Sequence, residues 1–82
     1  MPTTVTPQTV EDTVRHALTE LGADEDLLTR EATFEELDVD SLDLAELAQI
    51  VEEEYGVALK GDDVAQLRTV GQAIDLIVAR AA

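Results

Sequence analysis

Apolar residues near the start of the chain repeat at the spacing of one helical face. They are Val10, Val14, Ala17, Leu18 and Leu21. This three- and four-residue spacing predicts a helix over 7–21. Thr6 or Thr9 can serve as its N-cap, Pro7 suits its first turn, and Gly22 ends it.

A second helix is predicted to begin at Asp40 and to end at Gly56. The Asp40 side chain can cap the free amides, and Asp43 occupies the position of the acidic partner in a capping box. At 100° per residue, one stripe faces the core and consists of Leu44, Leu47, Ala48, Val51 and Tyr55. The residues predicted to point away from that stripe are Leu42, Ala45, Glu46, Gln49 and Glu53.

The last third of the chain predicts one short and one longer helix. Asp62 can cap a single helical turn through Gln66, and Thr69 with Gln72 forms a T-x-x-Q capping box. The longer helix covers 70–81, and its apolar face consists of Val70, Ala73, Ile74, Ile77 and Ala81.

The segment 22–39 lacks sustained periodicity and is predicted to be a long loop. Its apolar residues Leu27, Leu28, Phe34 and Leu37 should pin it across the helices. The fold class expected is therefore all-α, a four-helix bundle with three longer helices, one short helix and a long loop between the first two. We expect one domain over 1–82, with a flexible N-terminus at 1–6.

The charge of the chain restricts its partners. A chain of 82 residues has a formal net charge of -14 and five Lys and Arg residues together, which argues against direct binding of nucleic acid. No basic residue lies between Arg30 and Lys60, whereas acidic residues are dense there. Such a surface favours basic proteins. The 45% hydrophobic content still predicts a folded domain.

The composition excludes cysteine-based sites and gives no sign of a membrane span or signal peptide. Cysteine is absent, so there is no disulfide, thiolate metal site or thiol catalysis. No apolar run has the length of a membrane span, and the N-terminus lacks the features of a signal peptide. We expect a free-standing cytoplasmic monomer that binds neither membranes nor nucleic acid.

Catalytic and metal sites are also not predicted. A calcium loop beginning at Asp38 does not fit the EF-hand pattern at three positions. It would place Leu42 at a ligand position, Asp43 at the turn glycine and Gln49 at the bidentate glutamate. His16, the single histidine, is expected to be structural because no serine elbow or orienting partner accompanies it. We therefore expect no metal site and no catalytic residue.

Ser41 combines two features that set it apart. It lies at a predicted helix start, and it lies within the acidic stretch 31–54, where no base is available to activate it. These features indicate that Ser41 is an attachment point for chemistry done by other proteins. Taken alone, Asp40-Ser41-Leu42 is a short motif that also fits an ordinary first-turn serine.

A longer pattern carries a family resemblance over about Thr33 to Val78. It consists of FEELDVDSLDLAEL at 34–47, EEEYGV at 52–57, DDV at 62–64 and LRTV at 67–70. In motif and helix order, the chain resembles an acyl carrier protein of bacterial fatty acid or polyketide synthesis.

The resemblance implies a 4'-phosphopantetheine arm on Ser41, attached by a phosphopantetheinyl transferase that uses coenzyme A and magnesium. It implies that Asp40 orients the serine and the metal during modification. Partner enzymes with basic docking surfaces, such as an acyltransferase or ketosynthase, would contact Leu42, Ala45, Glu46, Gln49 and Glu53. The acyl chain would lie in a pocket between the second and third helices, lined by Ala48, Val51, Leu59, Val64 and Leu67.

Some residues depart from the commonest family pattern. Asp38 stands where many members have glycine, Lys60-Gly61 where Ile-Pro or similar is frequent, and Gln49 where fatty acid carriers usually have an apolar residue. These differences favour a specialised polyketide-type pathway. The alternatives are a housekeeping fatty acid carrier and a peptidyl or aminoacyl carrier. From another class, an unmodified acidic adaptor for a basic protein is a further alternative.

Overall fold

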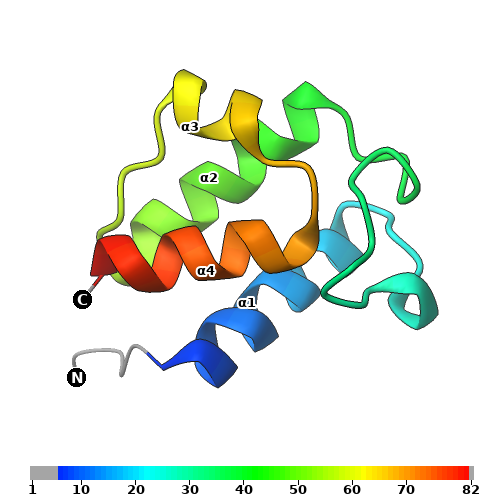
Figure 1. Ribbon diagram of the computed structural model, residues 1–82, viewed down its shortest axis with the longest axis horizontal. Helices are drawn as coiled ribbons and strands as arrows, with labels where there is room; N and C mark the ends of the chain where they lie inside the picture. The colour runs from blue at the N-terminus through cyan, green and yellow to red at the C-terminus, as the bar shows by residue number, and fades with distance from the viewer. Residues whose placement is uncertain (1–5, 82) are drawn as a thin grey trace.

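The computed structural model describes residues 6–81, and residues 1–5 and 82 lie outside the described part. The described chain forms four α-helices, α1 (Pro7–Glu20), α2 (Ser41–Tyr55), α3 (Gly61–Gln66) and α4 (Val70–Ala81), and one 3₁₀ turn, η1 (Glu25–Leu27). This architecture confirms the all-α prediction of three longer helices and one short helix (Figure 1).

Helix α1 begins where two threonines exchange hydrogen bonds. The Thr9 amide donates to the Thr6 hydroxyl at 3.1 Å, and the Thr6 amide donates to the Thr9 hydroxyl at 3.0 Å. Thr6 is therefore the N-cap, and Thr9 is its capping-box partner. The segment predicted to be flexible, 1–6, lies outside the described residues except for Thr6.

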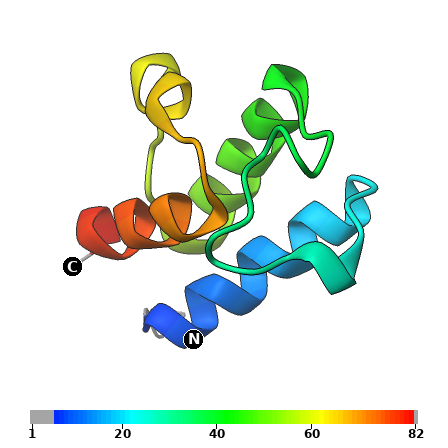
Figure 2. The same cartoon turned by 45° about the vertical axis from the view of Figure 1, so that its right-hand side comes forward.

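The three longer helices enclose the core, and α3 packs beside α2 on the side of the molecule away from α1 (Figures 1 and 2). The predicted core face of α1 is buried at Val10, Val14, Ala17 and Leu18. The stripe predicted for α2 is buried at Leu47 and Val51, and half-buried at Leu44, Ala48 and Tyr55. Helix α4 contributes Val70, Ala73, Ile74 and Ile77 to the same core.

A polar contact joins α1 to the last turn of α2. The hydroxyls of Tyr55 and Thr13 lie 2.6 Å apart, and the Tyr55 hydroxyl donates to the Thr9 carbonyl at 3.1 Å. Half-buried hydrogen bonds of this kind add directional constraint to apolar packing. They fix the spacing of the two helices at this end.

The loop between α1 and α2 is anchored by apolar side chains that enter the core at irregular intervals. Its buried residues are Ala23, Leu28, Ala32, Phe34, Leu37 and Val39. The prediction that Leu27 also pins the loop was wrong, because its side chain is 54% exposed. Leu27 ends η1, and the turn directs only its neighbour Leu28 into the core.

The same loop pairs its backbone with the segment that leads into α4. The Phe34 amide donates to the Arg68 carbonyl at 2.9 Å, and the Val70 amide donates to the Ala32 carbonyl at 3.0 Å. The Gly71 amide donates to the Arg30 carbonyl at 2.9 Å. A β-carbon at position 71 would lie 3.0 Å from that carbonyl oxygen, closer than most side-chain contacts, so a larger residue there would push the two segments slightly apart.

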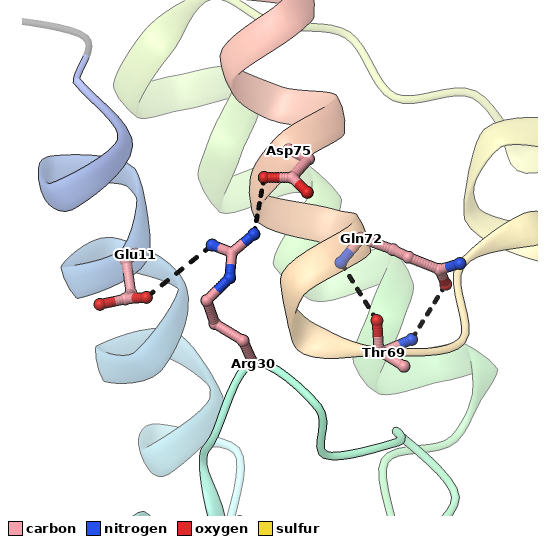
Figure 3. Close-up of polar contacts among 5 residues, drawn as sticks. All are labelled: Glu11, Arg30, Thr69, Gln72 and Asp75. Atoms are coloured by element: carbon pink, nitrogen blue, oxygen red, sulfur yellow. Dashed lines mark hydrogen bonds and ion pairs between the residues drawn. The ribbon is translucent and has the colours of Figure 1, made fainter.

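Side chains reinforce this connection (Figure 3). The Arg30 guanidinium lies 2.8 Å from the Asp75 carboxylate on α4 and 4.0 Å from the Glu11 carboxylate on α1. Thr69 and Gln72 form the predicted capping box, with the Gln72 amide donating to the Thr69 hydroxyl at 3.2 Å. The loop is therefore held to both α1 and α4.

Asp38, the last residue of the turn that precedes α2, has a φ of 56°, in the left-handed region. Aspartate tolerates this region better than most residues, and glycine adopts it without a steric penalty. We expect Asp38→Gly to raise the free energy of unfolding by up to about 1 kcal/mol and Asp38→Val to lower it by roughly 1–2 kcal/mol. Urea unfolding measures both changes.

Asp38→Asn separates the effect of charge from the effect of backbone conformation, because asparagine also tolerates a positive φ. If Asp38→Asn stabilises the protein as much as Asp38→Gly does, relief of carboxylate repulsion explains the gain. In that case, the backbone contribution assigned to position 38 is wrong.

Candidate functional site

Ser41 is the first residue of α2, and its side chain is exposed. The preceding residue, Asp40, is the N-cap: its Oδ1 accepts a hydrogen bond from the Asp43 amide at 2.9 Å. The Asp43 carboxylate accepts in return from the Asp40 amide at 3.3 Å. The predicted cap at Asp40 is therefore confirmed, and it presents Ser41 at a fixed helix start.

The turn before Ser41 is closed by a backbone hydrogen bond within the end of the long loop. The Val39 amide donates to the Phe34 carbonyl at 2.9 Å, and both side chains are buried. The first helical hydrogen bond of α2 runs from the Leu44 amide to the Asp40 carbonyl at 3.0 Å. The amides of Ser41 and Leu42 precede it, so they lie at the end of the helix that favours negative charge.

Ser41 lies at one end of a groove between α2 and α3. The groove has a volume of about 350 Å³. It is lined by Ser41, Ala45, Ala48, Leu59, Gly61, Val64 and Ala65. Most of these side chains are small and apolar, so the two helices leave space between them that an apolar chain can fill.

The groove includes only part of the lining predicted for the acyl pocket. Ala48, Leu59 and Val64 line it as predicted, but Val51 and Leu67 do not. Val51 has no exposed surface, because it follows Leu47 by one helical turn on the core stripe of α2. Leu67 is the C-cap of α3, where the chain turns towards α4, and its side chain packs against the core.

Apart from Ser41, three lining residues are absent from the predicted pocket. The sequence predicts Ala45 on the partner-facing surface and predicts no role for Gly61 or Ala65. Gly61 and Ala65 are four residues apart, so they share one face of α3 with Val64. That spacing is present in the sequence, but a helix capped by Asp62 would exclude Gly61.

The start of α3 differs from the prediction in its cap. The helix begins at Gly61 with Lys60 as N-cap, and the Lys60 amide donates to the Asp63 carboxylate at 3.1 Å. Asp62 therefore lies inside the first turn and does not cap the helix.

The five residues predicted to point outward from α2 are all exposed. They are Leu42, Ala45, Glu46, Gln49 and Glu53. Leu42 is 68% exposed, the more exposed of the two large apolar side chains that lie mostly in solvent among the described residues. Beyond the apolar groove, Gln49, Glu52 and Glu53 line an adjoining hollow of about 600 Å³ that shares Ala45, Ala48 and Leu59 with it. Together the groove and this hollow form one trough that leads away from Ser41, and its lining changes from apolar to polar along the way.

Helix α3, which forms one wall of the groove, contributes no fully buried residue. A two-point ion pair ties it to α4: the Arg80 Nη2 donates to Asp63 Oδ1 at 2.7 Å, and Nη1 donates to Oδ2 at 3.1 Å. The hydrogen bond from Arg80, followed by that from the Lys60 amide, holds the pKa of Asp63 below its ordinary value of 3.8.

This lowered pKa predicts a pH-dependent contribution to stability. Because the folded chain holds Asp63 ionised, the stabilisation is present above the ordinary pKa of 3.8 and is lost as pH falls through the lower folded value. We expect Asp63→Asn to lower the thermal midpoint at about pH 7, with a difference from wild type that narrows at acidic pH.

Asp62→Asn is the matched control, since Asp62 is exposed on the same short helix. Thermal unfolding of the three proteins across pH measures the effect. A difference between wild type and Asp63→Asn that stays constant down to acidic pH would show that the ionised pair with Arg80 is not its source.

The remaining candidate groups lie apart from this site. His16 on α1 pairs with Glu20, with Nε2 and Oε1 3.3 Å apart, and both side chains are largely exposed. Among residues 6–81, no three His, Asp or Glu side chains are grouped so as to hold a metal ion. Over the same residues, the helices are too short or too polar to cross a bilayer.

Comparisons with known proteins agree on one family. The family model described as "Phosphopantetheine attachment site" matches residues 8–77. An acyl carrier protein of Rubrobacter xylanophilus is 42% identical over 59 residues, which are 71% of this chain and 73% of that protein.

Two solved structures have similar folds. The crystal structure of an acyl carrier protein from Thermotoga maritima aligns with a TM-score of 0.74 at 26% identity, covering 89% of this chain and 86% of that one. The solution structure of the acetyl actinorhodin acyl carrier protein from Streptomyces coelicolor aligns with a TM-score of 0.70 at 30% identity. That alignment covers 99% of this chain and 95% of that one.

Proposed function

The chain belongs to the phosphopantetheine-attachment family of acyl carrier proteins, and we propose that Ser41 is its attachment residue. The observation that carries this proposal is the placement of an exposed serine hydroxyl at the first position of α2 and at the end of the α2–α3 groove. The family match defines the prosthetic group, and the local structure supports the choice of residue.

The residues around Ser41 fit a phosphodiester-linked arm. The Ser41 and Leu42 amides lie at the positive end of a 15-residue helix, where they can offset part of the phosphate charge. The arm supplies a thiol, which the chain itself lacks, to hold acyl groups as thioesters. Asp40 is fixed by its cap to Asp43, and we propose that its carboxylate also orients the serine and the metal during modification.

The groove beside Ser41 is proposed to shelter the apolar part of the cargo. Its lining by Ala45, Ala48, Leu59 and Val64 offers a low-polarity surface of about 350 Å³. Helix α3 can adjust around the cargo, because none of its own side chains is fully buried; the Asp63–Arg80 ion pair keeps it attached to α4.

The outward face of α2 is proposed to dock partner enzymes with basic surfaces. Leu42 offers an exposed apolar contact, and Glu46, one turn further along the same face, and Glu53, about three turns further, add negative charge that can steer association. These partners include a phosphopantetheinyl transferase and acyl-processing enzymes such as an acyltransferase or ketosynthase. Ala45 belongs both to this face and to the groove, so docking and cargo shelter share a boundary there.

We further propose that the chain acts in the cytoplasm, as a non-catalytic monomer, in polyketide or related specialised biosynthesis. Gln49 and two glutamates line the distal part of the trough, which suits a partly polar cargo better than a long alkyl chain. The likeness to the actinorhodin carrier also supports this pathway. A housekeeping fatty acid carrier and a peptidyl or aminoacyl carrier are the competing assignments.

Intact mass spectrometry tests the proposal. With coenzyme A, magnesium and a broad-specificity phosphopantetheinyl transferase, the protein should gain one phosphopantetheinyl unit and one free thiol, and fragmentation should locate the gain at Ser41. An unmodified chain would instead support the acidic adaptor.

A comparison of partner enzymes tests the pathway. Acyl transfer from the loaded protein to a polyketide ketosynthase should exceed transfer to a fatty acid ketosynthase; the reverse would favour the housekeeping carrier.

A further inference from the structure

A second groove lies between α1 and α2, on the other flank of α2 from the α2–α3 groove that is proposed to shelter the cargo (the cargo groove). Its volume is about 440 Å³, and its apolar floor includes Ala17 and Ile50. At 100° per residue, Ile50 points roughly 140–160° away from Ala45 and Ala48, which line the cargo groove. At 1.5 Å per residue, it is also about 13 Å further along the helix axis than Ser41.

Carboxylates from both helices line this groove. Asp12 and Glu20 come from α1, and Glu54 comes from α2. Glu20 pairs with His16, but within residues 6–81 neither Asp12 nor Glu54 has an ion pair or a side-chain hydrogen bond. No Lys or Arg side chain lines the groove. The two carboxylates are therefore open to an external cation.

The groove is held in shape by the contacts between its helices. The hydroxyl of Thr13, one of the lining residues, lies 2.6 Å from the Tyr55 hydroxyl, and Ala17 is packed in the core. A docking partner does not need to order this surface first, which lowers the entropic cost of binding.

We propose that this groove is a second docking site, for a basic amphipathic helix of a partner enzyme. Arginine fits it best, because its aliphatic stem can lie along Ala17 and Ile50 while its guanidinium reaches carboxylates from both walls. The chain's charge of -14 excludes a polyanion as the occupant. The partner proposed is thus a cationic protein segment with an apolar face.

Docking here leaves Ser41 and the cargo groove uncovered. A partner could hold the carrier at the α1–α2 groove while its active site receives the arm, and contact with the Leu42 face would add a second attachment. Two linked contacts raise the effective concentration of the second one. The α1–α2 groove would then distinguish partners that possess the basic helix from those that contact only α2.

NMR titration of the ¹⁵N-labelled full-length protein tests this site. The probe is a capped amphipathic peptide of leucine and arginine, and the control peptide has citrulline in place of arginine. We expect the largest amide shifts over 12–20 and 50–54, and clearly weaker binding of the citrulline peptide. Shifts centred on Leu42 and Glu46 would overturn the proposal, as would the same shifts produced by magnesium chloride alone.

Paired variants separate the groove from the general negative charge. Asp12→Asn with Glu54→Gln should weaken peptide binding roughly three- to tenfold at 0.1 M salt, since each exposed ion pair contributes modestly. Glu35→Gln with Glu36→Gln removes the same charge from the exposed loop and should change binding by less than about twofold. Equal weakening by both pairs would show that the attraction is non-specific and the proposal is wrong.

The inference does not depend on the arm. All measurements use the unmodified protein, so their failure would leave the mass test of Ser41 unaffected. Conversely, a chain that is never modified could still bind the peptide at the α1–α2 groove.

Discussion

Ser41→Ala is expected to abolish phosphopantetheinylation completely while leaving the fold unchanged. The variant lacks the hydroxyl that would form the phosphodiester, so it should gain neither mass nor thiol under conditions that modify the wild type fully. The exposed hydroxyl makes no hydrogen bond within the described chain that holds α2 in place, because the cap is formed by Asp40 and Asp43. Stability should change by no more than about 0.5 kcal/mol.

Circular dichroism and urea unfolding provide the folding control for this variant. Two threonine hydroxyls serve as the check for modification elsewhere, and both already accept hydrogen bonds: Thr33 from the Glu36 amide at 3.1 Å, and Thr69 from the Gln72 amide at 3.2 Å. Modification of Ser41→Ala at either threonine would move the attachment site. Loss of helical content would mean that Ser41 has a structural role that its exposed position does not indicate.

Phe34→Ala is expected to have the largest effect on stability. Phe34 is buried, its amide bonds to Arg68, and its carbonyl accepts from Val39 just before the cap of α2. Removing a buried phenylalanine side chain typically costs about 3–5 kcal/mol. That is a large share of the roughly 4–12 kcal/mol expected for a domain of this size. The thermal midpoint should fall by more than about 12 °C.

Two controls make this prediction specific. Phe34→Leu keeps most of the buried volume and should lose much less stability, whereas Leu42→Ala removes an exposed side chain and should change stability within about 0.5 kcal/mol. Differential scanning calorimetry compares the three variants. If Phe34→Ala lowers the midpoint no more than Leu42→Ala does, the loop does not depend on this anchor.

The position of Ser41 matters for both predictions because the loop and the helix fix it from opposite sides. The Phe34–Val39 contact sets where the chain enters the turn, and the Asp40–Asp43 cap sets where α2 begins. We therefore expect Phe34→Ala, at a temperature where it remains folded, to be modified more slowly than wild type. A mobile helix start spends less time in the geometry that the transferase requires.

Local signals in the sequence determined the helices and the exposed face of α2. The spacing of Val10 and Val14 placed α1, and the polar caps at Asp40 and Thr69 placed the starts of α2 and α4, because such signals act over one or two turns. The exposure of Leu42 and Glu46 followed from the angle per residue. Ser41 could be recognised as a candidate because it follows the predicted cap at Asp40 within the acidic stretch 31–54.

Interactions between distant segments were decided only by the tertiary structure. The spacing of α1 and α2 created the carboxylate-lined groove at Asp12 and Glu54, and the packing of α3 beside α2 determined that Ala45 lines the α2–α3 groove and that Val51, which the helical period already places on the core stripe, does not. The close approach of Arg30 to Gly71 depends on residues that no local pattern relates. A sequence period tells which side of a helix is apolar, but which neighbour covers that side, and where space remains, depends on how the helices pack together.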